Sequence, residues 1–321
     1  MSLSLIFIHQ GYSDYLPFTL RQARATNPDT PIYLLGDADN DRFDFLNHID
    51  VSTFSEAVTP FNRVYRHRST NRQAFELACF QRWFLLRAFM EAAGLEAVLV
   101  LDSDVLLYTE AATLYNYHIA GHEFGLCIPD AQEPFRWSAF PHVLYWTRPV
   151  IQRFCDFLLD VYTDPKAFTP FQEKWNYHIK NGLSGGLCDM TALYRFAHAH
   201  GLSRTANFLN ISHDTTIDLN LNKAENESPN AYEMAGPLKR LDWSEAPYPH
   251  GYHLRLKRPI AFLALHCQGA AKAYIPAFYR GPHFQGRKRL SLAVAMHYRL
   301  RPLATRLSVP LRRLLAYRRR A

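Results

Sequence analysis

The 321-residue sequence lacks the features of a membrane-spanning or secreted, disulfide-bonded chain. No uninterrupted apolar run reaches the ~18 residues that a spanning helix needs. The opening residues, MSLSLIFIHQGY, have no basic segment or cleavage site, so we expect a first core strand rather than a signal peptide. The cysteines number five and none has zinc-knuckle spacing, which favours reduced thiols in a cytosolic protein.

Acidic residues are missing from the last 76 residues of the chain. All 29 Asp and Glu lie at or before Glu245, whereas residues 246–321 contain 16 Lys and Arg. The net charge of +7 therefore combines −9 for residues 1–245 with +16 for the remainder. Such an asymmetry indicates that the basic end has a partner of its own.

The segment 287–320 contains eleven basic residues and no acidic one. Its leucines recur at helical spacing between arginines, and two prolines divide it into short pieces: Leu303, Leu307, Leu311, Leu314, Leu315, Pro302 and Pro310. We therefore predict that 281–321 is a basic amphipathic helical tail that binds an anionic membrane surface. Nucleic acid is the competing partner. The leucine stripe favours lipid, so we expect no nucleic acid. A C-terminal helix packed on the core remains an alternative.

The rest of the chain, residues 1–280, reads as one α/β domain. Apolar residues make up 48% and charged residues 20% of the sequence, as in globular proteins. Close strand–helix–strand spacing favours a parallel sheet. The predicted strands are 3–9, 31–35, 49–51, 97–101, 105–107, 124–128 and 261–266. The predicted helices are 17–25, 72–93, 150–162 and 190–200. The helix 72–93 has an expected apolar stripe of Phe75, Cys79, Trp83, Leu86 and Met90, and the Asn-rich stretch 209–226 is expected to be a surface loop.

Two carboxylates interrupt an otherwise apolar stretch, VLVLDSDVLLY. Asp102 and Asp104 follow a buried strand, at the end that faces the ligand crevice of an open α/β sheet. Two such charges repel unless something neutralises them. Mg²⁺ or Mn²⁺ commonly binds one or two carboxylates together with substrate phosphates. The alternatives are a polar turn and a haloacid-dehalogenase-type phosphatase, although the downstream lysine and acidic pair of that family are not evident.

The strand followed by Asp-x-Asp resembles the metal site of GT-A glycosyltransferases. A second segment, HCQGAAK at 266–272, resembles the His-x-x-Gly-x-x-Lys segment of the family-eight, glycogenin-like group. The resemblance implies a GT-A-like, Rossmann-like nucleotide-sugar-binding fold with a mixed central sheet. It also implies that Asp102, Asp104 and His266 hold Mn²⁺ or Mg²⁺ while Gly269 and Lys272 approach the diphosphate. The sequence continues AYIP where the family has Pro-Trp, and a strand-end histidine with a satisfied hydrogen bond is the alternative for His266.

Other residues are candidates for holding the donor. Those expected near the nucleotide or its sugar are His9, Gln10, Tyr12, Asp37, Arg82, Ser103, Gly185 and Gly186. Asp189 follows the glycine turn SGGLCD, and in the resembling enzymes a nearby acidic residue grips the donor sugar or acts in catalysis. The plainer alternatives are a turn aspartate at position 37, a solvated Arg82 and a helix N-terminal carboxylate at Asp189.

These features predict a metal-dependent glycosyltransferase, a hexosyltransferase. It would move a sugar from a nucleotide-sugar donor, with a UDP-sugar favoured by the resemblance, to a hydroxyl of a glycan or lipid-linked acceptor. Cell-surface polysaccharide or lipopolysaccharide synthesis at the inner face of the cell membrane is the expected setting. The resemblance favours retention, whereas Asp189 acting as a base would mean inversion. The alternatives are a metal-dependent phosphatase or nucleotide hydrolase, and a non-catalytic membrane-surface binding protein.

Overall fold

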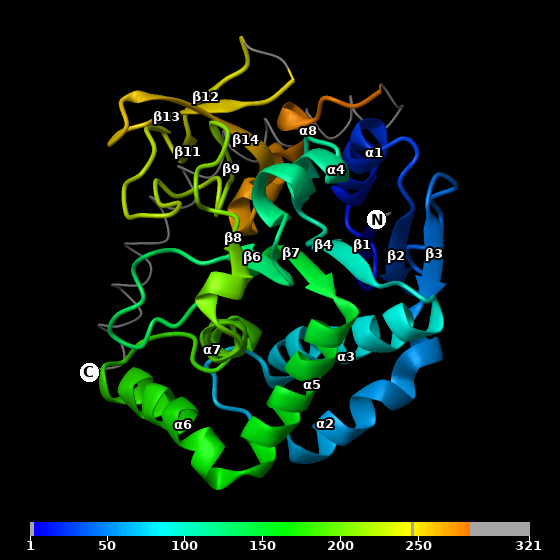
Figure 1. Ribbon diagram of the computed structural model, residues 1–321, viewed down its shortest axis with the longest axis vertical. Coiled ribbons are helices and arrows are strands. Elements are labelled where there is room, and N and C mark those ends of the chain that lie inside the picture. The colour runs from blue at the N-terminus through cyan, green and yellow to red at the C-terminus, as the bar shows by residue number, and fades with distance from the viewer. Residues whose placement is uncertain (1–2, 245–246, 283–321) are drawn as a thin grey trace, which may run out of the picture.

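The computed structural model describes residues 3–244 and 247–282 (Figure 1). The α-helices are α1 (Leu16–Thr26), α2 (Thr59–Val64), α3 (Gln73–Ala92), α4 (Ala111–Leu114), α5 (Arg148–Thr163), α6 (Pro165–Lys180), α7 (Asp189–His200) and α8 (Ile275–Phe278). The strands are β1 (Ser4–Ile8), β2 (Ile32–Gly36), β3 (Asn47–Asp50), β4 (Ala97–Leu101), β5 (Val105–Leu107), β6 (Phe124–Cys127), β7 (Phe140–Thr147), β8 (Thr205–Asn207), β9 (Thr215–Ile217), β10 (Met234–Ala235), β11 (Leu238–Lys239), β12 (Leu241–Asp242), β13 (His250–His253) and β14 (Arg258–His266).

The main sheet has the strand order β3-β2-β1-β4-β7-β6-β8. Strands β1 to β4 pair in parallel, whereas β7 is antiparallel to both β4 and β6. A second sheet has the order β12-β13-β14-β5, and β9 joins it beside β14. The predicted fold class, α/β with a mixed central sheet, is confirmed.

Strand β4 is buried on both faces, as its uninterrupted apolar sequence predicts. Val98 and Val100 pack into the cluster that contains side chains of α3, α5 and α7, and Leu99 and Leu101 pack with those of α1. Figure 1 shows α3, α5 and α7 below the main sheet and the second sheet above it. Alternate side chains of β4 thus pack into two different clusters, and β4 is the middle strand of the main sheet. Its carboxyl end lies between the layer of helices α3, α5 and α7 and the second sheet.

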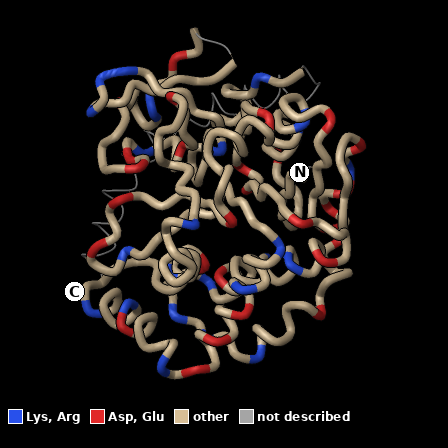
Figure 2. The backbone as a smooth tube through the Cα atoms, in the orientation of Figure 1, with Lys and Arg blue, Asp and Glu red and all other residues tan. Residues whose placement is uncertain are grey.

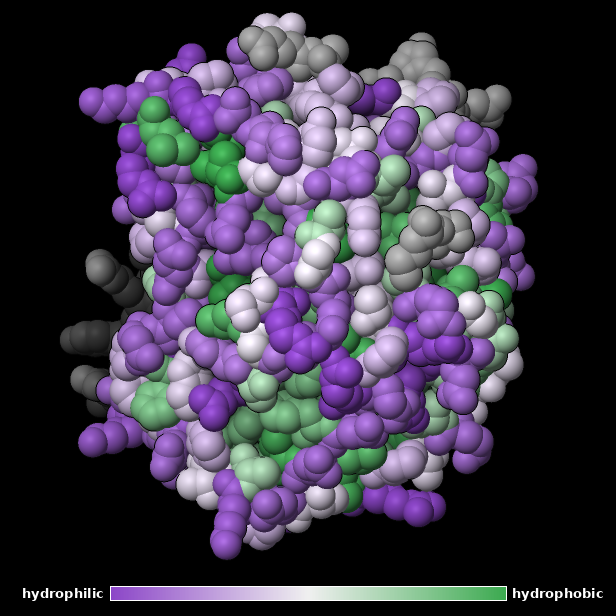
Figure 3. Space-filling model, viewed as in Figure 1, coloured by the Kyte–Doolittle hydropathy of each residue, from purple (hydrophilic) through white to green (hydrophobic). Residues whose placement is uncertain are grey.

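Figure 2 shows acidic and basic residues interspersed along the described chain, and the face drawn in Figure 3 is largely hydrophilic with smaller apolar areas. Among the described residues, none of the helices combines the length and the hydropathy that a membrane-spanning segment requires. The five cysteines are all free. The predicted tail, 281–321, and its basic stretch 287–320 lie outside the described residues, apart from Gly281 and Pro282.

The helix predicted at 72–93 is α3, but its expected apolar stripe is wrong at one end. Phe75 is 60% exposed, whereas Phe80 and Phe84 are buried together with Trp83 and Leu86. The reason is that α3 is apolar nearly all round, so residue spacing alone does not say which side is covered. Phe75 lies in the first turn of α3, where its exposed ring forms part of the wall of the cavity described below.

The Asn-rich stretch 209–226 is not a surface loop. It contains β9, and it buries Asp218, Asn220 and Asn226. These polar residues are accommodated because the buried ammonium of Lys239 donates to the Asp218 carboxylate and to the Asn220 carbonyl, and the Leu219 N–H donates to Asn226 Oδ1. Strand β7 and helix α6 were not expected either.

Candidate functional site

A cavity of about 370 Å³ lies at the carboxyl ends of β1 and β4. Its walls come from β1, α3, the turn after β4, the start of β7, the glycine turn and the loop after β14. Ten predicted site residues line it: His9, Arg82, Asp102, Ser103, Asp104, Gly185, Gly186, Asp189, His266 and Lys272. The cavity therefore gathers residues from distant parts of the sequence at the edge where an open α/β sheet binds ligands.

Asp102, Asp104 and His266 come together because the two sheets meet at the turn after β4. Asp102 follows β4, and the Val105 N–H donates to the Asp102 carbonyl at 3.0 Å to close the turn. Strand β5 then pairs with β14 so that Val105 lies opposite His266. One ligand atom from each of the three predicted metal residues lies within 4.8 Å of the others.

The orientation of His266 fits a cation. Its Nδ1 lies 2.8 Å from the Leu219 carbonyl, and because a carbonyl only accepts, Nδ1 carries the hydrogen. In the neutral ring, Nε2 is then a bare acceptor, and it faces Asp104 Oδ1 at 3.6 Å. Asp104 and His266 are 7% and 4% exposed. An imidazole lone pair and carboxylate oxygens converging in a buried place are the donor set of a divalent metal.

His142 stacks on the ring of His266, with centroids 4.1 Å apart and planes 7° apart. Burial lowers the pKa of His142 well below its ordinary value, and His266 lowers it further. His142 therefore adds packing at this point without adding positive charge.

Arg82 bridges two of the predicted carboxylates. From α3 it donates to Asp102 Oδ1 at 2.8 Å and to Asp189 Oδ2 at 2.6 Å. Burial acts to lower the pKa of Arg82, but Asp189 and Asp102 raise it above its ordinary value. Burial raises the pKa of Asp102, and Arg82 opposes that rise. With a side chain only 18% exposed, Arg82 is not the solvated arginine that was the alternative.

Lys272 and His9 complete the polar lining on the β1 side. Lys272 Nζ lies 3.2 Å from Asp104 Oδ2. Burial alone would lower the pKa of Lys272, but Asp104 and Tyr15 raise it. His9 Nδ1 lies 2.9 Å from Ser103 Oγ, and the pKa of His9 is lowered by burial first and by Lys272 second. Lys272 therefore adds a positive charge beside the acidic pair.

The glycine turn is clamped to the segment before α3. Thr70 N–H donates to the Gly185 carbonyl at 2.9 Å, and Leu187 N–H donates to the Arg68 carbonyl at 2.7 Å. Gly186 has φ +142, and a Cβ there would collide with the Arg68 carbonyl. Packing alone therefore requires glycine at this position.

The other four predicted residues do not line the cavity. Gln10 is exposed and Tyr12 is 42% exposed, with Arg42 over its ring. Asp37 accepts from the N–H groups of Gly11 and Asp39, so its carboxylate closes a turn. Gly269, with φ +60, begins a short 3-10 helix. A position close to the end of a strand in the sequence was therefore not sufficient to place these four side chains in the cavity.

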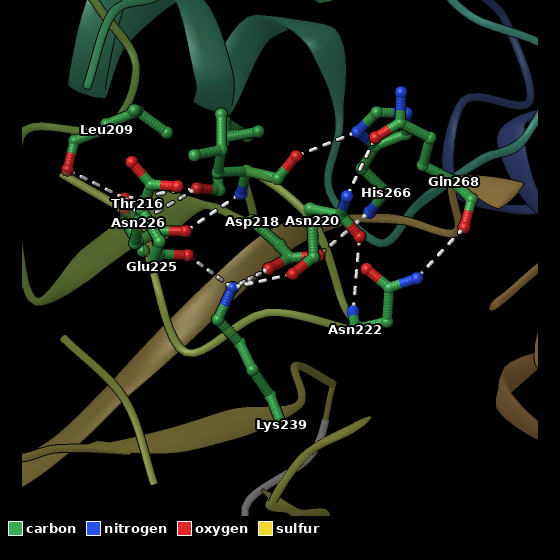
Figure 4. Close-up of polar contacts among 12 residues, drawn as sticks. Leu209, Thr216, Asp218, Asn220, Asn222, Glu225, Asn226, Lys239, His266 and Gln268 are labelled. Atoms are coloured by element: carbon green, nitrogen blue, oxygen red, sulfur yellow. Dashed lines mark hydrogen bonds and ion pairs between the residues drawn. The ribbon is translucent and has the colours of Figure 1, made fainter. Parts of the chain in front are cut away.

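The sequence reasoning missed residues that line the cavity or support it. Tyr15, Asn71, Glu76, His142 and Gln268 line it. Asp218 and Lys239 lie behind His266 (Figure 4). The one available signal was the density of Asn and Asp in 209–226, which we interpreted as solvent exposure.

No protein-family model matches the chain, and no curated protein matches it in sequence. Among solved structures it is similar to mouse xyloside xylosyltransferase 1 in its apo form, with 11% identity, 62% of this chain and 83% of that chain covered, and a TM-score of 0.44. It is similar to an active-site mutant of LgtC, with 16% identity, 92% and 96% covered, and a TM-score of 0.44. It is also similar to the galactosyltransferase LgtC in complex with donor and acceptor sugar analogs, with 16% identity, 60% of this chain and 70% of that chain covered, and a TM-score of 0.36. Because these TM-scores lie below 0.5, we base the proposed function on the cavity.

Proposed function

We propose that this protein is a metal-dependent hexosyltransferase that uses a nucleotide-sugar donor. The observation that carries the proposal is the cluster of the half-buried Asp102 with the buried Asp104 and His266, in which acceptor atoms converge within 4.8 Å. Carboxylates this close to one another repel, and the ion pair of Arg82 with Asp102 offsets only part of that charge. Lys272 supplies one positive charge at the edge of the cluster, and a diphosphate would bring further negative charge.

The three residues Asp102, Asp104 and His266 would hold Mn²⁺ or Mg²⁺. Such an ion, when bound, neutralises the charge that develops on a departing nucleoside diphosphate. Lys272 is placed to add a fixed positive charge beside the phosphates, which is a preorganised form of electrostatic stabilisation. The metal ion and Lys272 would both act on the phosphates, where negative charge develops as the bond between the sugar and the phosphate breaks heterolytically.

The sugar would lie on the other side of Asp102, against Asp189 and the glycine turn. Arg82 holds the carboxylates of Asp102 and Asp189 in place, so each can accept from sugar hydroxyl groups through an oxygen that Arg82 does not use. Arg82 engages Asp189 Oδ2 and leaves Oδ1 open; we assign Oδ1 to the donor sugar, and its use as a base on the acceptor would instead mean inversion. This assignment agrees with retention, which the family-eight resemblance favours.

The donor would be a UDP-sugar and the acceptor a glycan or lipid-linked hydroxyl, in cell-surface polysaccharide or lipopolysaccharide synthesis. The basic stretch 287–320 supports this setting, because it would bring a cytoplasmic enzyme to the anionic inner face of the membrane where lipid-linked acceptors lie. With membrane binding assigned to the tail, residues 1–280 would form the catalytic domain.

A thermal-shift panel of nucleoside diphosphates, with and without Mn²⁺, tests the donor site. We expect one diphosphate to raise the melting temperature of the wild type only with metal, and to have no effect on Asp104→Asn. Asp156→Asn is the matched control, because Asp156 is exposed on α5. No shift with any nucleotide, or equal shifts in wild type and Asp104→Asn, would reject the donor site.

Two other functions make different predictions. A metal-dependent phosphatase or nucleotide hydrolase would turn over without an acceptor sugar, so transfer to an added glycan separates it from a transferase. A non-catalytic membrane-surface binding protein would keep its role when Asp102 and Asp104 are both changed to Asn. The cluster of buried acceptors favours the enzymes over the binding protein.

A further inference from the structure

His266 is bonded at every polar atom except Nε2 (Figure 4). Its main-chain N–H donates to Asp218 Oδ2 at 3.1 Å, and its Nδ1–H donates to the Leu219 carbonyl at 2.8 Å. Its main-chain carbonyl accepts from the Leu221 N–H at 3.0 Å. Residues 218–221 therefore fix the position, ring orientation and tautomer of His266, and they leave only Nε2 to face Asp104.

A buried lysine holds this segment in turn. Lys239 Nζ is fully buried and lies 2.5 Å from Asp218 Oδ1, 3.0 Å from the Asn220 carbonyl and 3.0 Å from the Glu225 carbonyl. An ammonium has three donors, so all three are used. Asp218 likewise uses one oxygen for Lys239 and the other for His266. We call residues 218–226 together with Lys239 the histidine cradle.

The histidine cradle also reaches the next lining residue. Asn220 Nδ2 donates to Gln268 Oε1 at 2.7 Å, and Asn222 Nδ2 lies 3.4 Å from the Gln268 carbonyl. Leu219 N–H donates to Asn226 Oδ1 at 2.8 Å, which anchors the far end of the segment. Polar contacts from this segment thus also hold Gln268, in the loop after β14, where it lines the cavity.

A fully buried ion pair is a weak source of stability, because the cost of desolvating two charges offsets their attraction. A well-packed apolar pair would fill the same space at similar stability, but it could not accept from the His266 N–H. The contacts of Asp218 and Lys239 therefore orient His266, which an apolar pair could not do. Orientation of a metal-binding imidazole by its other contacts is a known determinant of metal affinity.

We infer that Asp218 and Lys239 are positioning residues for His266, acting through the histidine cradle to present Nε2 to the cation. This inference rests on the proposed metal site. It assigns a purpose to the segment 209–226 and to β11, neither of which contributes a group to the cavity itself.

Two double variants separate positioning from packing. Asp218→Leu with Lys239→Met removes both buried charges and the acceptor for the His266 N–H. Asp218→Asn with Lys239→Gln also removes the charges but keeps an amide oxygen in place of the carboxylate. Leu158→Ala, a fully buried change on α5, is a control for general destabilisation. Binding of Mn²⁺ is measured by the electron paramagnetic resonance signal of the free ion, at a temperature where all variants are folded.

We expect the Leu/Met variant to raise the Mn²⁺ dissociation constant by about 10- to 100-fold, the Asn/Gln variant to recover much of the loss, and Leu158→Ala to match the wild type. Wild-type affinity in a folded Leu/Met variant would overturn the inference.

A second measurement needs neither a metal nor a variant of Asp218 or Lys239. In metal-free wild type labelled with ¹⁵N-histidine, with His266→Gln used for assignment, we expect His266 to carry its hydrogen on Nδ1. Hydrogen on Nε2 in the neutral ring would overturn the inference. If the wild type bound no Mn²⁺ even with a nucleoside diphosphate, the proposed metal site would fail, while this tautomer would still report on the cradle itself.

Discussion

At the scale of single residues, the site depends on how a few buried charges are balanced. Arg82 serves two carboxylates, Lys272 serves one, and Lys239 serves Asp218 behind the cavity. Lys174 differs from these because its ammonium has no carboxylate partner among the residues that the structure describes. A buried charge of this kind is tolerated only when specific partners bind it.

Lys174 gives a prediction about pH. It is 2% exposed and donates to the Arg136 carbonyl and to Thr191 Oγ1, at 2.7 and 2.6 Å. Burial lowers its pKa from 10.5 to about 8. Between pH 8 and 10.5 the unfolded chain therefore binds more protons than the folded one, so this residue's contribution to stability rises with pH.

We expect the wild type to gain up to about 3 kcal/mol relative to Lys174→Met across that range. Urea unfolding of both proteins at several pH values measures the difference. A difference that stays flat from pH 8 to 10.5 would contradict the lowered pKa.

Gly186 gives a prediction about packing. Its φ of +142 costs an alanine about 1–3 kcal/mol, and a Cβ would also collide with the Arg68 carbonyl. Gly182→Ala is the matched control, because Gly182 also has positive φ but has open space around its Cβ position. We expect Gly186→Ala to lose more stability than Gly182→Ala in urea unfolding and to weaken donor binding. Equal losses would show that the clamp is not rigid.

Some of these residues were predictable from the sequence. Asp102 and Asp104 stand out because carboxylates directly follow an apolar strand, and His266 stands out through its spacing to Gly269 and Lys272. The Arg82 bridge and the Lys239 contacts were not predictable. They join residues that are 107 and 21 positions apart in the sequence, so they exist only once those distant segments have packed together.

At the scale of elements, strongly periodic or uniformly apolar segments were predicted well. Strands β4 and β5 have the predicted bounds, and α3 differs by one residue at each end. Strand β9 and the rest of 209–226 were missed because buried polar groups have the same composition as exposed ones. Position 37 was similarly ambiguous, since an aspartate after a strand can bind a ligand or close a turn.

Helix α3 gives a prediction that separates its two faces. Phe75 is 60% exposed and Leu86 is fully buried. We expect Phe75→Ala to change the free energy of unfolding by less than about 0.5 kcal/mol and Leu86→Ala to lower it by about 2–5 kcal/mol. Chemical denaturation of both variants measures this. A large loss for Phe75→Ala would mean that its ring packs against the chain in solution.

At the scale of the whole molecule, the site lies where two sheets join. Asp102 comes from the end of β4 in the main sheet, and His266 comes from the end of β14 in the second. The turn at Asp104 links them, since β4 and β5 belong to different sheets. Loss of contact between the sheets would therefore dismantle the proposed metal site even with every ligand present.

The basic end of the chain gives a prediction about membranes. Removing residues 283–321 takes away most of the positive charge of the C-terminal region. We expect the shortened protein to keep metal-dependent nucleotide binding and to lose sedimentation with vesicles that contain anionic lipid. Neutral vesicles serve as the control. Undiminished sedimentation with anionic vesicles would contradict a membrane role for 287–320.

Turnover of a nucleotide sugar tests the central claim most directly. Release of nucleoside diphosphate from a panel of nucleotide sugars is followed with Mn²⁺, with a chelator, and with added glycan acceptors. For the wild type and Asp156→Asn we expect metal-dependent release that an acceptor accelerates, and for Asp104→Asn a loss of at least about 100-fold. Release of nucleoside diphosphate at the same rate with the chelator, or at the same rate in Asp104→Asn, would contradict the account.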